Sequence, residues 1–268
     1  MRLPVNLPPN FREALAASDR PLAGMWVCSG SPLVAEICAG GGLDWLLIDM
    51  EHGPNQLESV LAQLQAVAAY PVSPLVRAPG LLPVMIKQIL DLGAQNILVP
   101  MIDTPEQAEA AVRAVRYPPH GNRGVGSALA RSARWNRVDD YLANADEHVS
   151  LFVQIESVTG VGNAAAIAAV DGVDGVFVGP SDLAASMGLL GKQNHPEVVS
   201  AVERTFDAVR GAGKPVGVNA FDPALASAYL EHGASFVLAG ADVAMLARGS
   251  EALAERFTGA PAPGRAGK

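Results

Sequence analysis

The chain has few lysines. The four are Lys87, Lys192, Lys214 and Lys268. An enzyme that forms an imine needs a lysine at the end of a strand in its active-site mouth. Lys192, in a loop after a predicted strand, is the only weak candidate, so imine chemistry is not expected.

Cysteines and aromatic residues are also scarce. Cys28 and Cys38 lack the spacing of metal ligands and are expected to be reduced core residues rather than a disulfide. Aromatic residues make up only 5% of a chain that is 50% hydrophobic, so we expect Ala, Val and Leu to fill the core.

The sequence also lacks features of several binding classes. A net charge of -8 argues against general binding to nucleic acid or to an anionic membrane. No apolar run is long enough to span a bilayer, and the Pro-rich start does not resemble a signal peptide, so a cytoplasmic protein is expected. The Gly-rich stretch 121–126 does not lie between a strand and a helix, as a dinucleotide-binding loop must, so nicotinamide cofactors are not expected.

One pattern recurs along the chain: a helix-ending Gly, a short polar link and an apolar strand. It occurs at 42–49, 93–100, 172–179 and 233–240. Other short strands are predicted at 24–28, 72–77, 151–156 and 215–219. Amphipathic helices are predicted at roughly 56–69, 82–92, 104–116, 157–170, 196–212, 223–232 and 242–257.

This alternation of strands and helices predicts an α/β fold with a parallel sheet covered by helices. Eight units favour a closed (β/α)8 barrel over an open doubly wound sheet. Helix starts are predicted at Thr104-Pro105, His195-Pro196 and Asp222-Pro223. We expect a single barrel domain over residues 1–257 and a flexible tail over 258–268.

One segment does not fit the alternation. Tyr117–Trp135 is long for a connection and rich in Gly, Pro and Arg. Around it lie six arginines with no acidic residue between them, namely Arg113, Arg116, Arg123, Arg131, Arg134 and Arg137. The segment is interpreted as a lid or a subunit contact that could face an acidic substrate or a partner subunit, and both readings stay open.

Polar residues follow most of the predicted strands. The carboxyl ends of barrel strands line the active mouth, so these residues form a candidate site. They are Asp49, Glu51, His52, Arg77, Gln154, Glu156, Asp182 and Asn219. Glu156 and Asp182 are oxygen ligands that favour Mg or Mn, with Co or Zn as alternatives. The competing interpretation is that both carboxylates cap helices or turns.

Arg77 ends an apolar strand, where a guanidinium can hold a carboxylate or stabilise an oxyanion. It could instead form a structural ion pair with Glu51 or Glu156. Asp49 and His52 are three residues apart, which would let the carboxylate orient the imidazole for general-base work, although a lone His is more often structural. Gln154 shares a face with Glu156 and could hydrogen-bond a ligand.

Several motifs together resemble the HpcH/HpaI aldolase family. They are residues 47–55 (LIDMEHGPN), 76–79 (VRAP), 123–127 (RGVGS), 133–136 (ARWN), 154–156 (QIE), 178–183 (VGPSDL) and 214–217 (KPVG). The resemblance implies a TIM barrel of the phosphoenolpyruvate/pyruvate-binding type. It also implies a class II, metal-dependent aldolase that cleaves 4-hydroxy-2-oxo acids to an aldehyde and pyruvate, or hydroxypyruvate, through a metal-stabilised enolate. No organic cofactor is implied.

The resemblance also implies roles for single residues. Glu156 and Asp182 would bind the metal, and Arg77 would stabilise the enolate. His52, oriented by Asp49, would act as acid and base with a metal-bound water. Pyruvate would be held by Gln154 and by the backbone near Pro180 and Ser181. The implied assembly is a homohexamer, a trimer of dimers that exchange the last helix.

One position departs from the family pattern. Asn219 stands where relatives commonly carry an apolar residue close to the acceptor aldehyde, so a polar acceptor is expected. Two alternatives remain at this stage. One is a citrate-lyase-like or malyl-CoA-lyase-like enzyme, and the other is a non-catalytic barrel that binds an acid.

Overall fold

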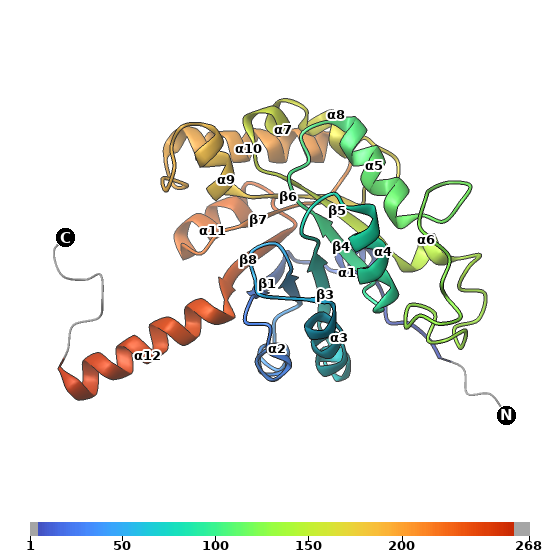
Figure 1. Ribbon diagram of the computed structural model, residues 1–268. Coiled ribbons are helices and arrows are strands. Elements are labelled where there is room, and N and C mark those ends of the chain that lie inside the picture. The colour runs from blue at the N-terminus through green and yellow to red at the C-terminus, as the bar shows by residue number, and fades with distance from the viewer. Residues whose placement is uncertain (1–4, 260–268) are drawn as a thin grey trace.

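The computed structural model describes residues 5–259, and its eight parallel strands close into a barrel (Figure 1). Each strand pairs with its neighbours in the sequence, and β8 pairs with β1. The strands are β1 (Leu22–Val27), β2 (Trp45–Asp49), β3 (Ser73–Arg77), β4 (Asn96–Val99), β5 (Ser150–Ile155), β6 (Gly175–Val178), β7 (Val216–Asn219) and β8 (Phe236–Ala241). The predicted (β/α)8 barrel is confirmed.

Helices surround the strands as the amphipathic pattern predicts. They are α1 (Phe11–Ala17), α2 (Pro32–Ala39), α3 (Leu57–Ala66), η1 (Val67–Ala69), α4 (Pro83–Asp91), α5 (Pro105–Val115), α6 (Ala145–His148), α7 (Val158–Gly162), α8 (Ala164–Ala168), α9 (Pro180–Ser186), α10 (Pro196–Gly211), α11 (Pro223–Glu231) and α12 (Asp242–Thr258). The helix predicted at 157–170 is divided at Asn163 into α7 and α8. Helices α1, α2, α6 and α9 were not predicted.

The three predicted helix starts are confirmed. Thr104 accepts a hydrogen bond from the Gln107 N–H in a capping box, and Pro105 occupies the first helical turn. Asp222 and His195 are the N-cap residues of α11 and α10, and each is followed by a proline.

The barrel interior differs from the composition-based expectation. Ala, Val, Leu and Ile dominate the layer between strands and helices, but aromatic rings fill the barrel itself. Phe11 of α1 enters this cluster, with its ring 5.3 Å from those of Trp45 and Phe152. Next to Phe236, a Cβ on Gly217 would lie 2.2 Å from the ring, so only glycine leaves room. Six of the 14 aromatic residues therefore gather inside the barrel, where a wide space must be filled.

The arginine-rich segment, defined here as residues 113–137, leads from α5 towards β5. It therefore reaches the amino-terminal ends of the strands, where the Arg131 N–H donates to the carbonyl of Asp91 at the end of α4. This position does not fit a lid over the chain's own carboxyl-terminal mouth. The predicted interpretation as a lid over the chain's own mouth is therefore wrong, because a segment that connects a helix to the next strand lies at the amino-terminal ends of the strands.

The last helix, α12, extends away from the barrel (red in Figure 1). Its exposed apolar residues are Val243, Met245, Leu246, Leu253 and Phe257. The helix includes Thr258, with which the predicted tail begins, and residues 260–268 of that tail lie outside the described residues. Within residues 5–259, no helix has both the length and the apolar character needed to cross a bilayer.

Candidate active site

Asp49 and Arg77 form the buried centre of the candidate site. They are the last residues of β2 and β3, and the register of these strands pairs them directly. The Nε and Nη2 atoms of Arg77 each donate to one carboxylate oxygen of Asp49, both at 2.8 Å. This bidentate pair satisfies both groups in a site where only 5% of the arginine side chain is exposed.

A second carboxylate, that of Glu51, approaches the same guanidinium. Its Oε2 atom lies 2.9 Å from Nη1 of Arg77. Burial opposes the charge of Arg77, but the hydrogen bonds and charge of Asp49 outweigh it, and the pKa of the guanidinium is raised. Burial raises the pKa of Glu51 despite Arg77. The predicted alternative of an Arg77–Glu51 ion pair is thus present, together with an unpredicted partner.

His52 lies at the rim of the site. Its side chain is 67% exposed, and its Nε2 atom lies 4.0 Å from Glu51. The carboxylate of Asp49 is bound to Arg77 and to the Glu51 N–H, at 3.0 Å, and not to the imidazole of His52. The expected orientation of His52 by the Asp49 side chain is therefore not what the described contacts show.

Glu156 and Gln154 follow one face of β5, as predicted. Glu156 is buried, accepts the Met101 N–H at 2.9 Å and receives a short hydrogen bond from the amide of Gln154. Its pKa is raised to about 7, chiefly by burial and further by the charges of Glu51 and Asp182. Within residues 5–259, Glu156 forms no ion pair like the one between Asp49 and Arg77.

Gly179 provides the space that Glu156 occupies. The register that pairs Ile155 with Val178 places Glu156 beside this glycine. A Cβ at position 179 would lie 2.6 Å from the Oε2 atom of Glu156 and 2.8 Å from the Gln154 amide nitrogen. Any larger residue here would displace the carboxylate.

Pro180, Ser181 and Asp182 follow β6 and form the first turn of α9. Pro180 is buried in the first turn, while Ser181 and Asp182 are exposed. The charge of Asp182 raises the pKa of both Glu51 and Glu156, so it lies near them in the mouth. The predicted neighbourhood of Glu156 and Asp182 is therefore present in the structure.

Asn219 and Trp26 complete the mouth from the other side. The indole Nε1 of Trp26, on β1, donates to Oδ1 of Asn219 at 2.9 Å. The same indole lies under the Arg77 guanidinium, 4.1 Å from its centre. Asn219 therefore holds an aromatic ring that in turn stacks on the central arginine.

The donor set fits a divalent cation. Asp49, Glu51 and Glu156 act on the Arg77 guanidinium, and the charge of Asp182 acts on Glu51 and Glu156, so carboxylates outnumber this guanidinium at the mouth. The Oε1 atom of Gln154 is buried without a hydrogen-bond partner among the described residues. No group of three or more His, Cys, Asp or Glu residues in the range 5–259 is arranged as a complete metal site. Two protein carboxylates, with other ligands from substrate and water, would suit a hard cation.

Three contributors were not predicted from the sequence. Trp26 was predicted only as part of a strand. Its position on the strand next to β2, which ends in Asp49, could have indicated that its side chain lies near the candidate site. The Met101 N–H reaches Glu156 from the connection after β4, and Met101 has a positive φ of 57°. The side chain of Cys28 lies 3.9 Å from Asp49, and burial raises the pKa of this thiol to about 12.

The amino-acid sequence of this chain is similar to those of known proteins. Residues 22–249 match the HpcH/HpaI aldolase/citrate lyase family. The chain is 54% identical over 260 residues to a hydroxypyruvate/pyruvate aldolase of Deinococcus radiodurans, covering 96% of this chain and 94% of the relative. It is 52% identical over 247 residues to a 4-hydroxy-2-oxo-heptane-1,7-dioate aldolase of Salmonella dublin, covering 92% and 94%.

A solved structure is similar over the same range. The crystal structure of a HpcH/HpaI aldolase/citrate lyase family protein from Burkholderia cenocepacia superposes with a TM-score of 0.88 at 42% sequence identity. The match covers 92% of this chain and 98% of that one.

Proposed function

The chain belongs to the HpcH/HpaI aldolase/citrate lyase family and is a carbon–carbon lyase, and we propose that it cleaves 4-hydroxy-2-oxo acids reversibly to pyruvate and an aldehyde. The observation that best supports this reaction is the buried Arg77, fixed by Asp49 beside Glu156 and Gln154 at one mouth. Such a cation is suited to stabilise the negative charge that develops on a 2-oxo acid when its carbon–carbon bond breaks.

Arg77 would act on the keto oxygen. Its two hydrogen bonds to Asp49 fix the plane of the guanidinium, and Trp26 supports one face. A donor held in this way needs little reorganisation when charge develops on the substrate. In this proposal Asp49 is the positioning residue of Arg77.

His52 is proposed as the acid/base group. Its exposed position at the rim would let its imidazole exchange protons with water and with the substrate hydroxyl. Because Asp49 is bound to Arg77, Glu51 is the nearer partner for orienting the imidazole. Gln154 and the backbone at Pro180 and Ser181 would hold the substrate carboxylate.

Glu156 and Asp182 would hold the divalent metal, for which we propose Mg or Mn because the donors are hard oxygens. Bound there, the metal would act as a Lewis acid towards a 2-oxo acid. The excess of carboxylates over guanidinium groups at the mouth is consistent with a requirement for added positive charge.

Pyruvate is the proposed donor, and hydroxypyruvate is the second donor to be compared. The name of the Deinococcus relative includes both. For the acceptor, we propose a polar aldehyde, because Asn219 presents an amide to the mouth and only its oxygen is used by Trp26. The amide nitrogen could then donate to an acceptor hydroxyl.

The direct test is release of pyruvate from 4-hydroxy-2-oxo acids, measured by coupling to lactate dehydrogenase. Activity should require a divalent metal and disappear with a chelator, then return on addition of Mg or Mn. No pyruvate from any of several such acids would contradict the aldolase assignment. Full activity after exhaustive chelation would contradict the metal requirement.

We also propose a cytoplasmic homohexamer in which α12 is exchanged between subunits. The exposed apolar side chains of α12, including Phe257 at 75%, support a partner for this helix. Light scattering of the intact protein tests the assembly, and Leu253→Glu should weaken it. A wholly monomeric wild type at micromolar concentration would contradict this part of the proposal.

A further inference from the structure

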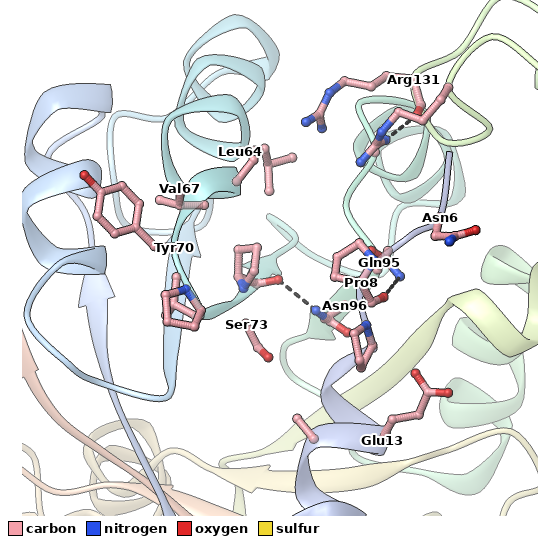
Figure 2. Close-up of a pocket in the computed structure, with 18 of the residues that line it drawn as sticks. Asn6, Pro8, Glu13, Leu64, Val67, Tyr70, Ser73, Gln95, Asn96 and Arg131 are labelled. Atoms are coloured by element: carbon pink, nitrogen blue, oxygen red, sulfur yellow. Dashed lines mark hydrogen bonds between the residues drawn. The ribbon is translucent and has the colours of Figure 1, made fainter. Parts of the chain in front are cut away.

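A cavity of about 520 Å³ lies at the amino-terminal ends of β3 and β4, on the face opposite the candidate active site (Figure 2). Its walls come from α1, from the link between α3 and β3, and from the arginine-rich segment. One side is apolar and includes Leu64 and Val67. Another carries Arg131 and Arg134.

The two arginines converge on one point. A Cβ built on Gly93 would lie 2.7 Å from Nη1 of Arg131 and 2.7 Å from Nη1 of Arg134. Gly93 follows Leu92, the C-cap of α4, and has a φ of 93°, a conformation that favours glycine. The turn after α4 therefore seats two guanidinium groups side by side.

Neither guanidinium pairs with a carboxylate among the described residues. Arg131 donates to the carbonyl of Leu92 at 2.9 Å, and Arg134 donates to the carbonyl of Arg131. Glu13 also lines the cavity, but its carboxylate accepts the Asn10 N–H at 2.8 Å. In Figure 2, Glu13 lies at the opposite end from Arg131.

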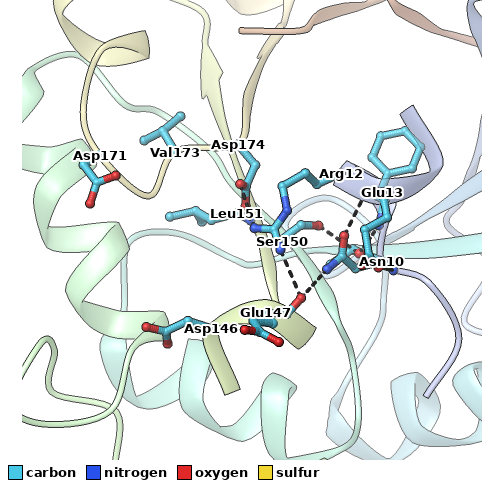
Figure 3. Close-up of polar contacts among 12 residues, drawn as sticks. Asn10, Arg12, Glu13, Asp146, Glu147, Ser150, Leu151, Asp171, Val173 and Asp174 are labelled. Carbon is cyan, nitrogen blue, oxygen red and sulfur yellow. Dashed lines mark hydrogen bonds and ion pairs between the residues drawn. The ribbon is translucent and has the colours of Figure 1, made fainter. Parts of the chain in front are cut away.

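Two other arginines on this face have acidic partners, whereas Lys214 donates to the carbonyl of Val173 at 2.7 Å. Arg12 donates to Asp174 at 3.0 Å in the neighbouring polar cluster (Figure 3), and Arg20 forms two hydrogen bonds with Asp44. Arg131 and Arg134 differ from Arg12 and Arg20 because neither has a carboxylate partner among the described residues.

Placing the two charges together carries an electrostatic penalty. Burial, and to a smaller extent the charge of Arg134, lower the pKa of Arg131 to about 10. Burial also lowers the pKa of Arg134. An anion between the two groups would offset this penalty, because each guanidinium retains N–H donors that no described group accepts.

We propose that this cavity binds a small oxyanion, a carboxylate or phosphate group carried on an apolar body. The forked N–H groups of Arg131 and Arg134 match the oxygens of such a group. Leu64 and Val67 would cover the apolar body. The site is separate from the strand-end carboxylates, so this inference does not depend on the proposed reaction.

Calorimetric titration of the full-length protein in chloride buffer tests the proposal. The probes are phenyl phosphate, benzoate and inorganic phosphate, and the first two distinguish a phosphate from a carboxylate head group. We expect at least one aromatic probe to bind more tightly than inorganic phosphate. Affinity should fall about tenfold or more in R131Q/R134Q, since two charge-assisted contacts are lost. Binding of no probe to the wild type would overturn the proposal.

Arg113→Gln is the matched control, because Arg113 is exposed in the same segment and pairs with Glu109. It should leave binding unchanged, and an equal loss in R113Q would indicate a general charge effect and overturn the assignment. Because Arg131 also caps α4, R134Q alone provides the second variant, with folding checked by circular dichroism. Unchanged affinity in folded R134Q, or in R131Q/R134Q, would overturn the site, since anions held by Arg77 would be insensitive to both changes.

Discussion

The two ends of this barrel differ in whether the arginines of their cavities are paired with carboxylates. At the carboxyl-terminal mouth, Arg77 is shared by Asp49 and Glu51, and further carboxylates leave negative charge in excess. At the amino-terminal face, Arg131 and Arg134 share a cavity, and no carboxylate of residues 5–259 is paired with either of them. The first end therefore favours a cation and the second an anion, which the net charge of the chain does not reveal.

The largest expected effect comes from Arg77→Ala. Removing the guanidinium takes away the positive charge that would stabilise the developing negative charge on the keto oxygen. Exchange of the pyruvate methyl protons should therefore fall about 10²–10³-fold or more. It also leaves Asp49 buried without its partner, at a cost of about 3–5 kcal/mol in the free energy of unfolding. Proton NMR of pyruvate in deuterated water measures the exchange.

Arg116→Ala is the comparison variant, because Arg116 pairs with acidic residues on the opposite face. It should exchange pyruvate protons like the wild type. Arg77→Lys keeps the charge without the bidentate fork and should be strongly impaired although folded. Wild-type exchange in folded Arg77→Ala or Arg77→Lys would remove Arg77 from the mechanism.

The next effect is expected from Gly179→Ala. The new methyl group would overlap the carboxylate of Glu156, so the side chain must move at a cost of about 1–3 kcal/mol. The concentration of Mn needed for half-maximal activity should rise. Gly162→Ala, where a Cβ meets nothing within 4 Å, is the control. An identical Mn requirement in the two variants would show that Glu156 does not hold the metal through this geometry.

A smaller effect is expected from Asn219→Ala, which leaves the Trp26 N–H without its acceptor. Loss of one such hydrogen bond is worth about 0.5–1.5 kcal/mol, so kcat/KM for aldol cleavage should fall roughly two- to tenfold. If Asn219 acts through Trp26, then Trp26→Phe should cause a similar loss, and the double variant should be no worse than either single one. Fully additive losses would contradict this coupling.

The smallest effect concerns a paired charge at the amino-terminal face. The hydrogen bond from Arg20 lowers the pKa of Asp44. Because the folded-state pKa is lowered, the pair's contribution is present above the unfolded pKa of about 3.9 and is lost as pH falls through the folded-state value. The contribution should be small, because the Arg20 side chain is largely exposed to solvent. Urea unfolding of Asp44→Asn and wild type should therefore differ at pH 7 and converge near pH 2.

Local signals explain which parts of the fold were predictable. The N-caps at Thr104 and Asp222 and the glycines that end helices lie within a few residues of the elements they mark. Strand ends were also predicted from local signals, because each apolar run stops at a polar residue. Asp49, Arg77, Glu156 and Asn219 were therefore identified as residues of the mouth. The expectation that small aliphatic residues fill the core failed inside the barrel, because composition does not say where the rings of Trp45 and Phe236 are placed.

The contacts between strands were harder to predict. Arg77 pairs with Asp49 because of the register of β2 and β3, which the sequence does not specify. The stacking of Trp26 on Arg77 likewise depends on closure of the barrel. The arginine-rich segment was recognised as unusual. The end of the barrel at which it lies, however, depends on which helix and strand it connects.

The hydrogen-bonded pairs that hold Arg77 and Trp26 differ in how far apart their members lie along the chain. Arg77 and Asp49 are 28 residues apart on consecutive strands, whereas Trp26 and Asn219 are 193 residues apart. Short loops close with a smaller entropy loss than long ones, so the Asp49–Arg77 pair can form early during folding. The indole can reach Asn219 only when β1 and β7 are brought together. The fluorescence difference between the wild type and Trp26→Phe during refolding should therefore report the late closure of the barrel.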